Sequence, residues 1–221
     1  MGYNIAIDGP AGAGKSTIAR RVAAKKGFVY VDTGAMYRGL AVHFIKQGID
    51  PEDPEAVISA CESAEVTIGY ENGIQQIYLN GENITGMLRE EAVGDMASKT
   101  SQIPEVRAKL LELQRSLART KDVVMDGRDI GTSILPDADV KVYLTASVKT
   151  RAKRRYDELT DKGISCDLAE IEADIANRDH RDMTRETSPL RQAEDAVLID
   201  SSHLTIEEVT EAVIALCRQE C

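Results

Sequence analysis

Hydrophobic residues along this chain fall into short continuous runs, separated by longer stretches with helical spacing. The runs are apolar throughout rather than alternating, which is typical of strands buried on both faces of a sheet. The helical stretches between them give the β–α alternation of a parallel sheet with helices on both sides. We therefore predict an α/β fold whose strands occupy residues 3–8, 28–32, 122–126, 140–144 and 196–200.

Two of the expected helices carry clear signals. Residues 104–120 begin with a proline and place Val106 and Leu110 on one face, as an amphipathic helix requires. Thr205 and Glu208 fit a capping box, so the last helix should start there.

The pattern changes over residues 63–96. Segments 64–69 and 74–80 resemble strands joined by a glycine-containing turn, with no crossover helix between them. We expect a small antiparallel sheet inserted into the α/β chain, which contributes little to the core. The remaining residues, 1–62 and 97–221, should form that core.

The segment GPAGAGKST directly follows the first predicted strand. It matches the phosphate-loop pattern, in which glycines let backbone N–H groups point at phosphate oxygens. Lys15 can reach the β- and γ-phosphates, and the Ser16 hydroxyl can ligate Mg²⁺. The expected ATP site comprises Gly9, Pro10, Ala11, Gly12, Ala13, Gly14, Lys15, Ser16 and Thr17.

Composition narrows the possible partners. A net charge of -10 disfavours a polyanionic partner, and two phenylalanines with no tryptophan disfavour stacking on single-stranded nucleic acid. No apolar run is long enough to span a membrane, and the first strand begins too early for a signal peptide. Four cysteines without CxxC spacing indicate ordinary thiols. We expect a cytoplasmic monomer that binds neither nucleic acid nor membrane.

Four of the predicted strands end in aspartate, at Asp8, Asp32, Asp126 and Asp200. The carboxyl ends of parallel strands form the edge at which α/β proteins bind ligands. Each carboxylate could hold a cation there, or it could cap the next helix or turn. The sequence leaves both alternatives open.

Arginine-containing motifs supply what a phosphate-bearing acceptor needs. They follow the second and third predicted strands and recur at residues 178–185, where positions 178, 181, 182 and 185 share one helix face. A solvated, salt-bridged face is the alternative for such a pattern. Beside a phosphate loop, the motifs favour a small phosphotransferase. No N-K-x-D motif of a guanine-reading GTPase is present.

Taken in order, IDGPAGAGKST, DTGAMYR, DGRDIGT and RDHRDMTR, with a β-rich insert after the first 60 residues, closely resemble the bacterial cytidylate kinases. Adenylate and guanylate kinases share the core but lack this insert. The resemblance implies a five-stranded parallel core, a nucleotide-monophosphate-binding insert and a helical lid at roughly 151–175. It also implies that ATP, with Mg²⁺, phosphorylates CMP or dCMP.

The resemblance also assigns residues to roles. Lys15, Arg128, Arg154 and Arg185 are expected to be catalytic through their charges. The acceptor phosphate would be bound by Arg38, Arg128 and Arg185. Cytosine would be recognised by Thr33, Ser98, Arg107 and Asp129, and the ribose by Arg178 and Asp182. Arg154 would approach the phosphates when the lid closes.

Two other functions stay open at this point. One is a kinase for a different acceptor, such as UMP or a sugar-like molecule. The other is a non-enzymatic, ATP-binding switch that signals through the insert. The sequence does not fix the preference between CMP and dCMP, or between ATP and GTP.

Overall fold

The computed structural model describes residues 2–217 of the chain. The chain divides into two compact units. One is built from Val31–Lys121, and the other comprises Tyr3–Tyr30 together with the residues from Asp122 onward. The predicted insert, 63–96, lies within the first of these units, and its standing as a separate substrate-binding domain stays a prediction.

The main sheet has five strands in the order β2-β6-β1-β7-β8, and β1 pairs in parallel with β6 and β7, as β7 does with β8. Each strand begins and ends within one residue of its predicted bounds. The pairing register sets Asp8 beside both Gly127 and Tyr143, so the carboxyl ends of the three central strands lie together. The strands are β1 (Asn4–Asp8), β2 (Val29–Asp32), β6 (Val123–Gly127), β7 (Val140–Thr145) and β8 (Val197–Asp200).

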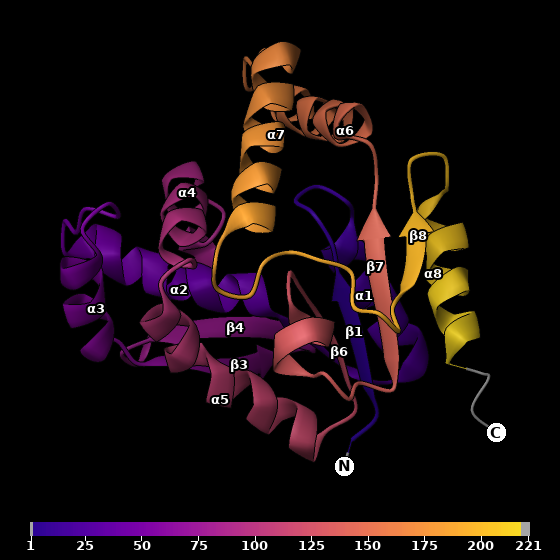
Figure 1. Cartoon of the computed structure of the whole chain (residues 1–221), viewed down its shortest axis with the longest axis horizontal. Coiled ribbons are helices and arrows are strands. Elements are labelled where there is room, and N and C mark those ends of the chain that lie inside the picture. The colour runs from indigo at the N-terminus through magenta and orange to yellow at the C-terminus, as the bar shows by residue number, and fades with distance from the viewer. Residues whose placement is uncertain (1, 218–221) are drawn as a thin grey trace. The chain divides into compact units, whose positions relative to one another are not determined.

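The core of this unit lies between the sheet and its helices. Ile5, Ile7 and Val124 on the central strands are fully buried, as strands covered on both faces should be. Figure 1 shows α8 beside β8, and α6 and α7 beyond the carboxyl end of β7. The predicted capping box opens α8. The helices are α1 (Lys15–Lys26), η2 (Ile130–Ile134), α6 (Val148–Asp161), α7 (Leu168–Thr184) and α8 (Ile206–Leu216).

The other unit combines helices with a small antiparallel sheet in the order β3-β4-β5. Asn72, at φ 52°, and Gly73, at φ 76°, form the tight turn between its first two strands. Its elements are α2 (Thr33–Lys46), α3 (Pro54–Glu62), β3 (Val66–Glu71), β4 (Ile74–Leu79), β5 (Glu82–Asn83), η1 (Thr85–Met87), α4 (Glu91–Thr100) and α5 (Pro104–Thr120).

The antiparallel sheet of the insert packs on helix α2. Ile77 and Leu79 of β4 are buried, and a Cβ added at Gly39 of α2 would lie 3.0 Å from an Ile77 methyl group. A sheet of three short strands cannot bury its apolar face alone, so it packs on the helix before it. Glycine at position 39 lets the sheet and α2 approach closely.

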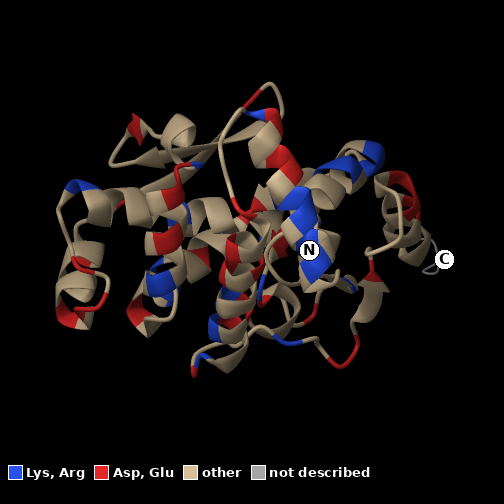
Figure 2. Cartoon of the chain, turned by 90° about the horizontal axis from the view of Figure 1, so that it is seen from above, with Lys and Arg blue, Asp and Glu red and all other residues tan. Residues whose placement is uncertain are grey.

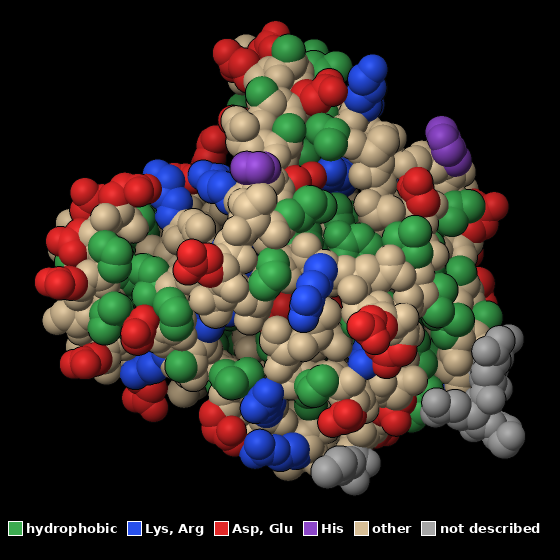
Figure 3. Space-filling model, in the orientation of Figure 1, with side chains coloured by type: hydrophobic (Ala, Val, Ile, Leu, Met, Phe, Trp, Pro, Cys, Tyr) green, Lys and Arg blue, Asp and Glu red, His purple; other side chains and the backbone are tan. Residues whose placement is uncertain are grey.

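Surface features agree with the composition. Acidic residues are distributed over helices and loops (Figure 2). Hydrophobic side chains are scattered among polar ones on the face in Figure 3. Within residues 2–217, no helix has the length and apolar character needed to cross a membrane. Cys61 and Cys166 carry unbridged thiols, and the Cys217 thiol donates to the Val213 carbonyl. Cys221 lies outside the described residues.

Candidate functional site

The phosphate loop has the backbone shape that its glycines predict. Gly9, Gly12 and Gly14 have φ values of 148°, 76° and 93°, which disfavour any residue with a Cβ. A Cβ at Gly9 would also overlap with the Leu144 carbonyl oxygen. Helix α1 begins directly after Gly14, so its first N–H groups face the loop without a capping side chain. Such an arrangement suits an anion.

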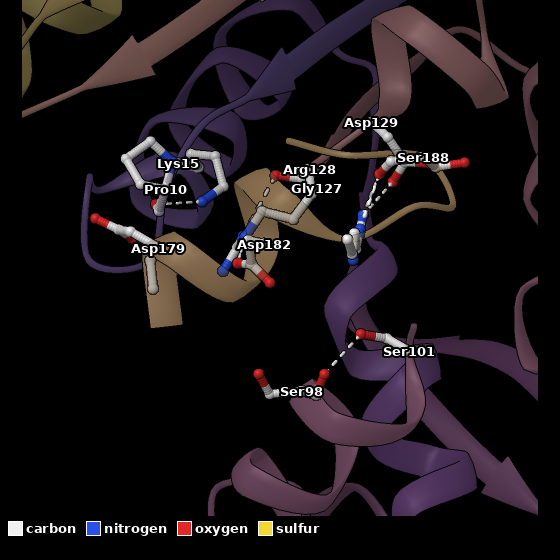
Figure 4. Close-up of polar contacts among 12 residues, drawn as sticks. Pro10, Lys15, Ser98, Ser101, Gly127, Arg128, Asp129, Asp179, Asp182 and Ser188 are labelled. Atoms are coloured by element: carbon white, nitrogen blue, oxygen red, sulfur yellow. Dashed lines mark hydrogen bonds and ion pairs between the residues drawn. The ribbon is translucent and has the colours of Figure 1, made fainter. Parts of the chain in front are cut away.

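Lys15 lies at the centre of this loop. Its side chain is buried, and its ammonium donates to the Pro10 carbonyl oxygen at 2.8 Å (Figure 4). Burial, together with the nearby charge of Arg128, lowers the pKa of Lys15 to about 7, although neighbouring carboxylates oppose the shift. A bound phosphate would favour the charged form of the Lys15 ammonium group.

Ser16 faces an aspartate at the end of β6. The Ser16 hydroxyl donates to Asp126 at 2.9 Å, and the Tyr30 hydroxyl donates to the other oxygen of the same carboxylate at 2.8 Å. A hydroxyl and a carboxylate are the hard oxygen ligands that Mg²⁺ takes. Residues 2–217 contain no cluster of three or more metal-binding side chains. The pair therefore fits an Mg²⁺ ion that arrives with nucleotide phosphates and keeps several waters.

The other strand-end aspartates bond to protein groups. Asp8 accepts from the backbone N–H groups of Ile130 and Gly131, both at 2.8 Å, and burial raises its pKa to about 6. Asp32 caps α2, and Asp200 accepts from Ser202. All three carboxylates thus cap a turn or the start of a helix, which is one of the two roles that the sequence left open.

An ion pair links two of the predicted acceptor residues. The Arg128 Nε donates to an Asp182 carboxylate oxygen at 2.8 Å, and both side chains are largely buried (Figure 4). Burial alone would lower the pKa of Arg128, but the charge of Asp182 raises it overall. Burial would raise the pKa of Asp182, but the charge of Arg128, with those of Arg178 and Arg185, lowers this pKa overall. Asp182 thus stays ionised and orients Arg128.

Arg185 lies directly after the helix that carries Arg178 and Asp182. Helix α7 ends at Thr184, and Arg185 has extended backbone angles at the C-cap. Its guanidinium donates twice to the Ser188 carbonyl, at 2.9 and 2.6 Å, and lies 3.7 Å from the Asp129 carboxylate. The helix thus reaches to within one residue of Arg185, and the charge of Arg185 still lowers the pKa of Asp182.

Two arginines of α6 contact other protein groups in this structure. Arg154, predicted to approach phosphates, donates to the Ser201 hydroxyl and carbonyl at 3.3 and 2.7 Å. Arg151 forms a buried two-point ion pair with Asp179 and donates to the Ala11 carbonyl of the phosphate loop at 2.9 Å. No pattern in the sequence indicated a role for Asp179, although it lies between the predicted site residues Arg178 and Asp182.

In the unit built from Val31–Lys121, Thr33 opens α2 and Arg38 lies one turn further on. The Asp32 carboxylate accepts from the Ala35 N–H at 2.8 Å and from the Arg38 guanidinium at 3.0 Å. A Cβ at Gly34 would lie 3.2 Å from atoms of both Asp32 and Arg38. The glycine therefore leaves room for this ion pair over the start of the helix.

Ser98 and Arg107 belong to the same unit. The Ser98 hydroxyl is buried and has no hydrogen-bond partner among the described residues. Arg107 donates to the Ser101 carbonyl at 3.2 Å and lies over the Tyr37 ring, and the Ser101 hydroxyl donates to the Ser98 carbonyl (Figure 4). An orphaned buried hydroxyl is costly, and a bound water or ligand would relieve that cost.

Comparison with known proteins gives a consistent result. A family model described as cytidylate kinase matches residues 5–219. Curated cytidylate kinases of Caldicellulosiruptor bescii and Caldicellulosiruptor saccharolyticus are 47% and 48% identical to this chain, over 96% of it and 94% of each relative. In fold alone, an uncharacterised protein from Eubacterium ventriosum is similar, with a TM-score of 0.53 at 12% identity over 99% of both chains. The chain belongs to the cytidylate kinase family.

Proposed function

We propose that this protein transfers the γ-phosphoryl group of ATP to CMP or dCMP, forming ADP and CDP or dCDP. Beyond family membership, one observation carries the proposal. The unit that holds the phosphate loop also holds two largely buried arginine–carboxylate pairs, Arg128 with Asp182 and Arg185 with Asp129. Buried guanidiniums oriented by carboxylates suit a phosphate-bearing acceptor far better than a neutral one.

On the donor side, residues 9–17 hold the ATP phosphates through backbone N–H groups and the Lys15 ammonium. Ser16 and Asp126 would hold the Mg²⁺ that accompanies ATP, and this ion would neutralise phosphate charge. Phosphoryl transfer depends mainly on positioning and electrostatic stabilisation. The buried Lys15 is therefore the main catalytic side chain of this loop.

On the acceptor side, Arg38, Arg128 and Arg185 bind the phosphate of CMP. The attacking oxygen already carries negative charge, so the reaction needs no general base. The arginines instead offset the repulsion between two anions. Arg128 can do so in a fixed orientation because Asp182 accepts from its Nε.

The nucleoside is bound by other groups. Arg178 and Asp182 bind the ribose, and a carboxylate can accept a hydrogen bond from the 2′-hydroxyl. We assign cytosine recognition to the residues that the family resemblance indicated. The buried, unpartnered hydroxyl supports this assignment for one of them. These residues are Thr33, Ser98, Arg107 and Asp129.

The lid and insert complete the proposal. Residues 151–175 lie in α6, α7 and their connection, and we propose that their closure moves Arg154 from Ser201 to the phosphates and excludes water. Residues 63–96 serve as the monophosphate-binding insert. The protein would act as a cytoplasmic monomer in pyrimidine nucleotide metabolism, without nucleic-acid partners.

A coupled ADP-release assay tests the function directly. The purified protein is given ATP and Mg²⁺ with CMP, dCMP, UMP or AMP in turn, and GTP then replaces ATP. We expect rapid turnover with CMP and dCMP and much slower turnover with AMP. Preference for UMP would indicate a different acceptor, and ATP binding without turnover of any acceptor would favour the switch function.

A further inference from the structure

Gln75 is the polar member of an otherwise apolar face of β4. Residues 75, 77 and 79 alternate inward along this strand, and Ile77 and Leu79 supply the apolar packing on that side. The Gln75 side chain is buried although its neighbours Ile74 and Gln76 are more exposed. Burying an amide is unfavourable unless both its polar ends find partners. Apolar packing alone therefore does not explain why a glutamine is buried at position 75.

Both ends of the Gln75 amide contact the backbone of one residue. The Asp32 N–H donates to Gln75 Oε1 at 2.8 Å, and Gln75 Nε2 donates to the Asp32 carbonyl at 3.1 Å. The side chain thus pairs with Asp32 as a neighbouring strand would. Both residues belong to the unit built from Val31–Lys121, and they lie 43 positions apart in the sequence.

Asp32 in turn holds the start of α2 and the predicted phosphate ligand Arg38. Its carboxylate accepts from the Ala35 N–H with one oxygen and from the Arg38 guanidinium with the other. The backbone of Asp32 is fixed by Gln75, and its side chain fixes Arg38. A continuous hydrogen-bonded chain therefore runs from the antiparallel sheet to the guanidinium.

We propose that Gln75 is a positioning residue for the acceptor, which sets the orientation of Arg38 through Asp32. This inference rests on the proposed function, in which Arg38 binds the acceptor phosphate. It gives the antiparallel sheet a second role besides its apolar packing, because the sheet then controls how well a monophosphate is held. The donor site should not depend on it.

The test compares Gln75→Met with Gln76→Met. Methionine keeps the length and burial of the side chain but cannot bond to Asp32, so Gln75→Met should fold. Gln76 lies next to it on the other face of the same strand and serves as the matched control. We expect Gln75→Met to raise the KM for CMP and dCMP by about 3- to 10-fold, the effect of one or two hydrogen bonds, with the KM for ATP unchanged. Gln76→Met should leave both unchanged.

A second comparison separates positioning from general destabilisation. If Gln75 acts through Arg38, then Gln75→Met should cause no further loss of kcat/KM for CMP in an Arg38→Ala background. An unshifted KM for CMP in Gln75→Met, or a full additional loss in the Arg38→Ala background, would overturn the inference. A wild-type protein that does not phosphorylate CMP would instead overturn the proposed function, and with it this role of Gln75.

Discussion

Asp182→Ala should separate two roles of one carboxylate. In the structure, Asp182 accepts from the Arg128 Nε at 2.8 Å and is almost fully buried. In the proposed complex it also accepts from the ribose 2′-hydroxyl. CMP and dCMP both need an oriented Arg128, but only CMP can donate a 2′-hydroxyl. The substitution should therefore harm both substrates, and CMP more.

The size of each effect follows from the kind of hydrogen bond. A hydrogen bond to a charged group contributes about 1.5–3 kcal/mol, so loss of the Arg128 contact should lower kcat/KM for dCMP by roughly 10- to 150-fold. Loss of the 2′-hydroxyl contact should cost CMP about 1–3 kcal/mol more. The ratio of kcat/KM for CMP to that for dCMP should therefore fall by roughly 5- to 150-fold.

The assay is steady-state ADP release with each substrate, for wild type, Asp182→Ala and Asp182→Asn. Asparagine keeps the volume and one acceptor oxygen but removes the charge that balances Arg128, Arg178 and Arg185. Asp182→Asn should therefore show a smaller loss of kcat/KM than Asp182→Ala with both substrates. Thermal melts of all three proteins check that the fold is retained.

Two results would refute the reasoning in different places. Equal losses for CMP and dCMP in Asp182→Ala would exclude the ribose contact. Unchanged turnover of dCMP would show that Asp182 does not position Arg128 for catalysis. Either outcome would leave the assignment of the phosphate loop intact.

Three further predictions concern the unit that holds the phosphate loop. Lys15→Met should fold but lose on the order of 10²-fold in kcat, and near wild-type kcat would refute the role of Lys15 in transfer. Since burial, aided by the charge of Arg128, lowers the pKa of free Lys15 to about 7 and bound phosphates would raise it, ATP affinity should fall as pH rises above about 7. Isothermal titration calorimetry should show ATP affinity falling with pH in wild type and depending less on pH in Lys15→Met. The same pH dependence in both proteins would contradict this explanation. Asp179→Ala leaves the buried Arg151 unpaired, which should cost about 3–5 kcal/mol and lower Tm by roughly 6–20 °C. Glu158→Ala, at an exposed ion pair, should change Tm by no more than about 2 °C, and equal shifts in the two variants would refute the argument.

Local patterns in the sequence determined most of the architecture. Continuous apolar runs gave the five strands of the main sheet to within one residue at each end, because strands covered on both faces need apolar residues at every position. The phosphate loop was equally predictable, since its glycines and Lys15 act through backbone geometry within nine consecutive residues. Motif order then indicated the family, which the comparisons confirm.

Contacts between distant residues were decided only by the tertiary structure. Asp8 and Asp126 look alike in the sequence, but one bonds to N–H groups 122 positions away and the other to Ser16, 110 positions away. The contacts of Arg185 with Ser188 and Asp129 lie outside helix α7, so helical spacing could not predict them. Gln75 carried no signal at all. Local periodicity specifies which face of a strand is buried, but strand order and packing determine which groups meet there, and those depend on chain segments far apart in the sequence.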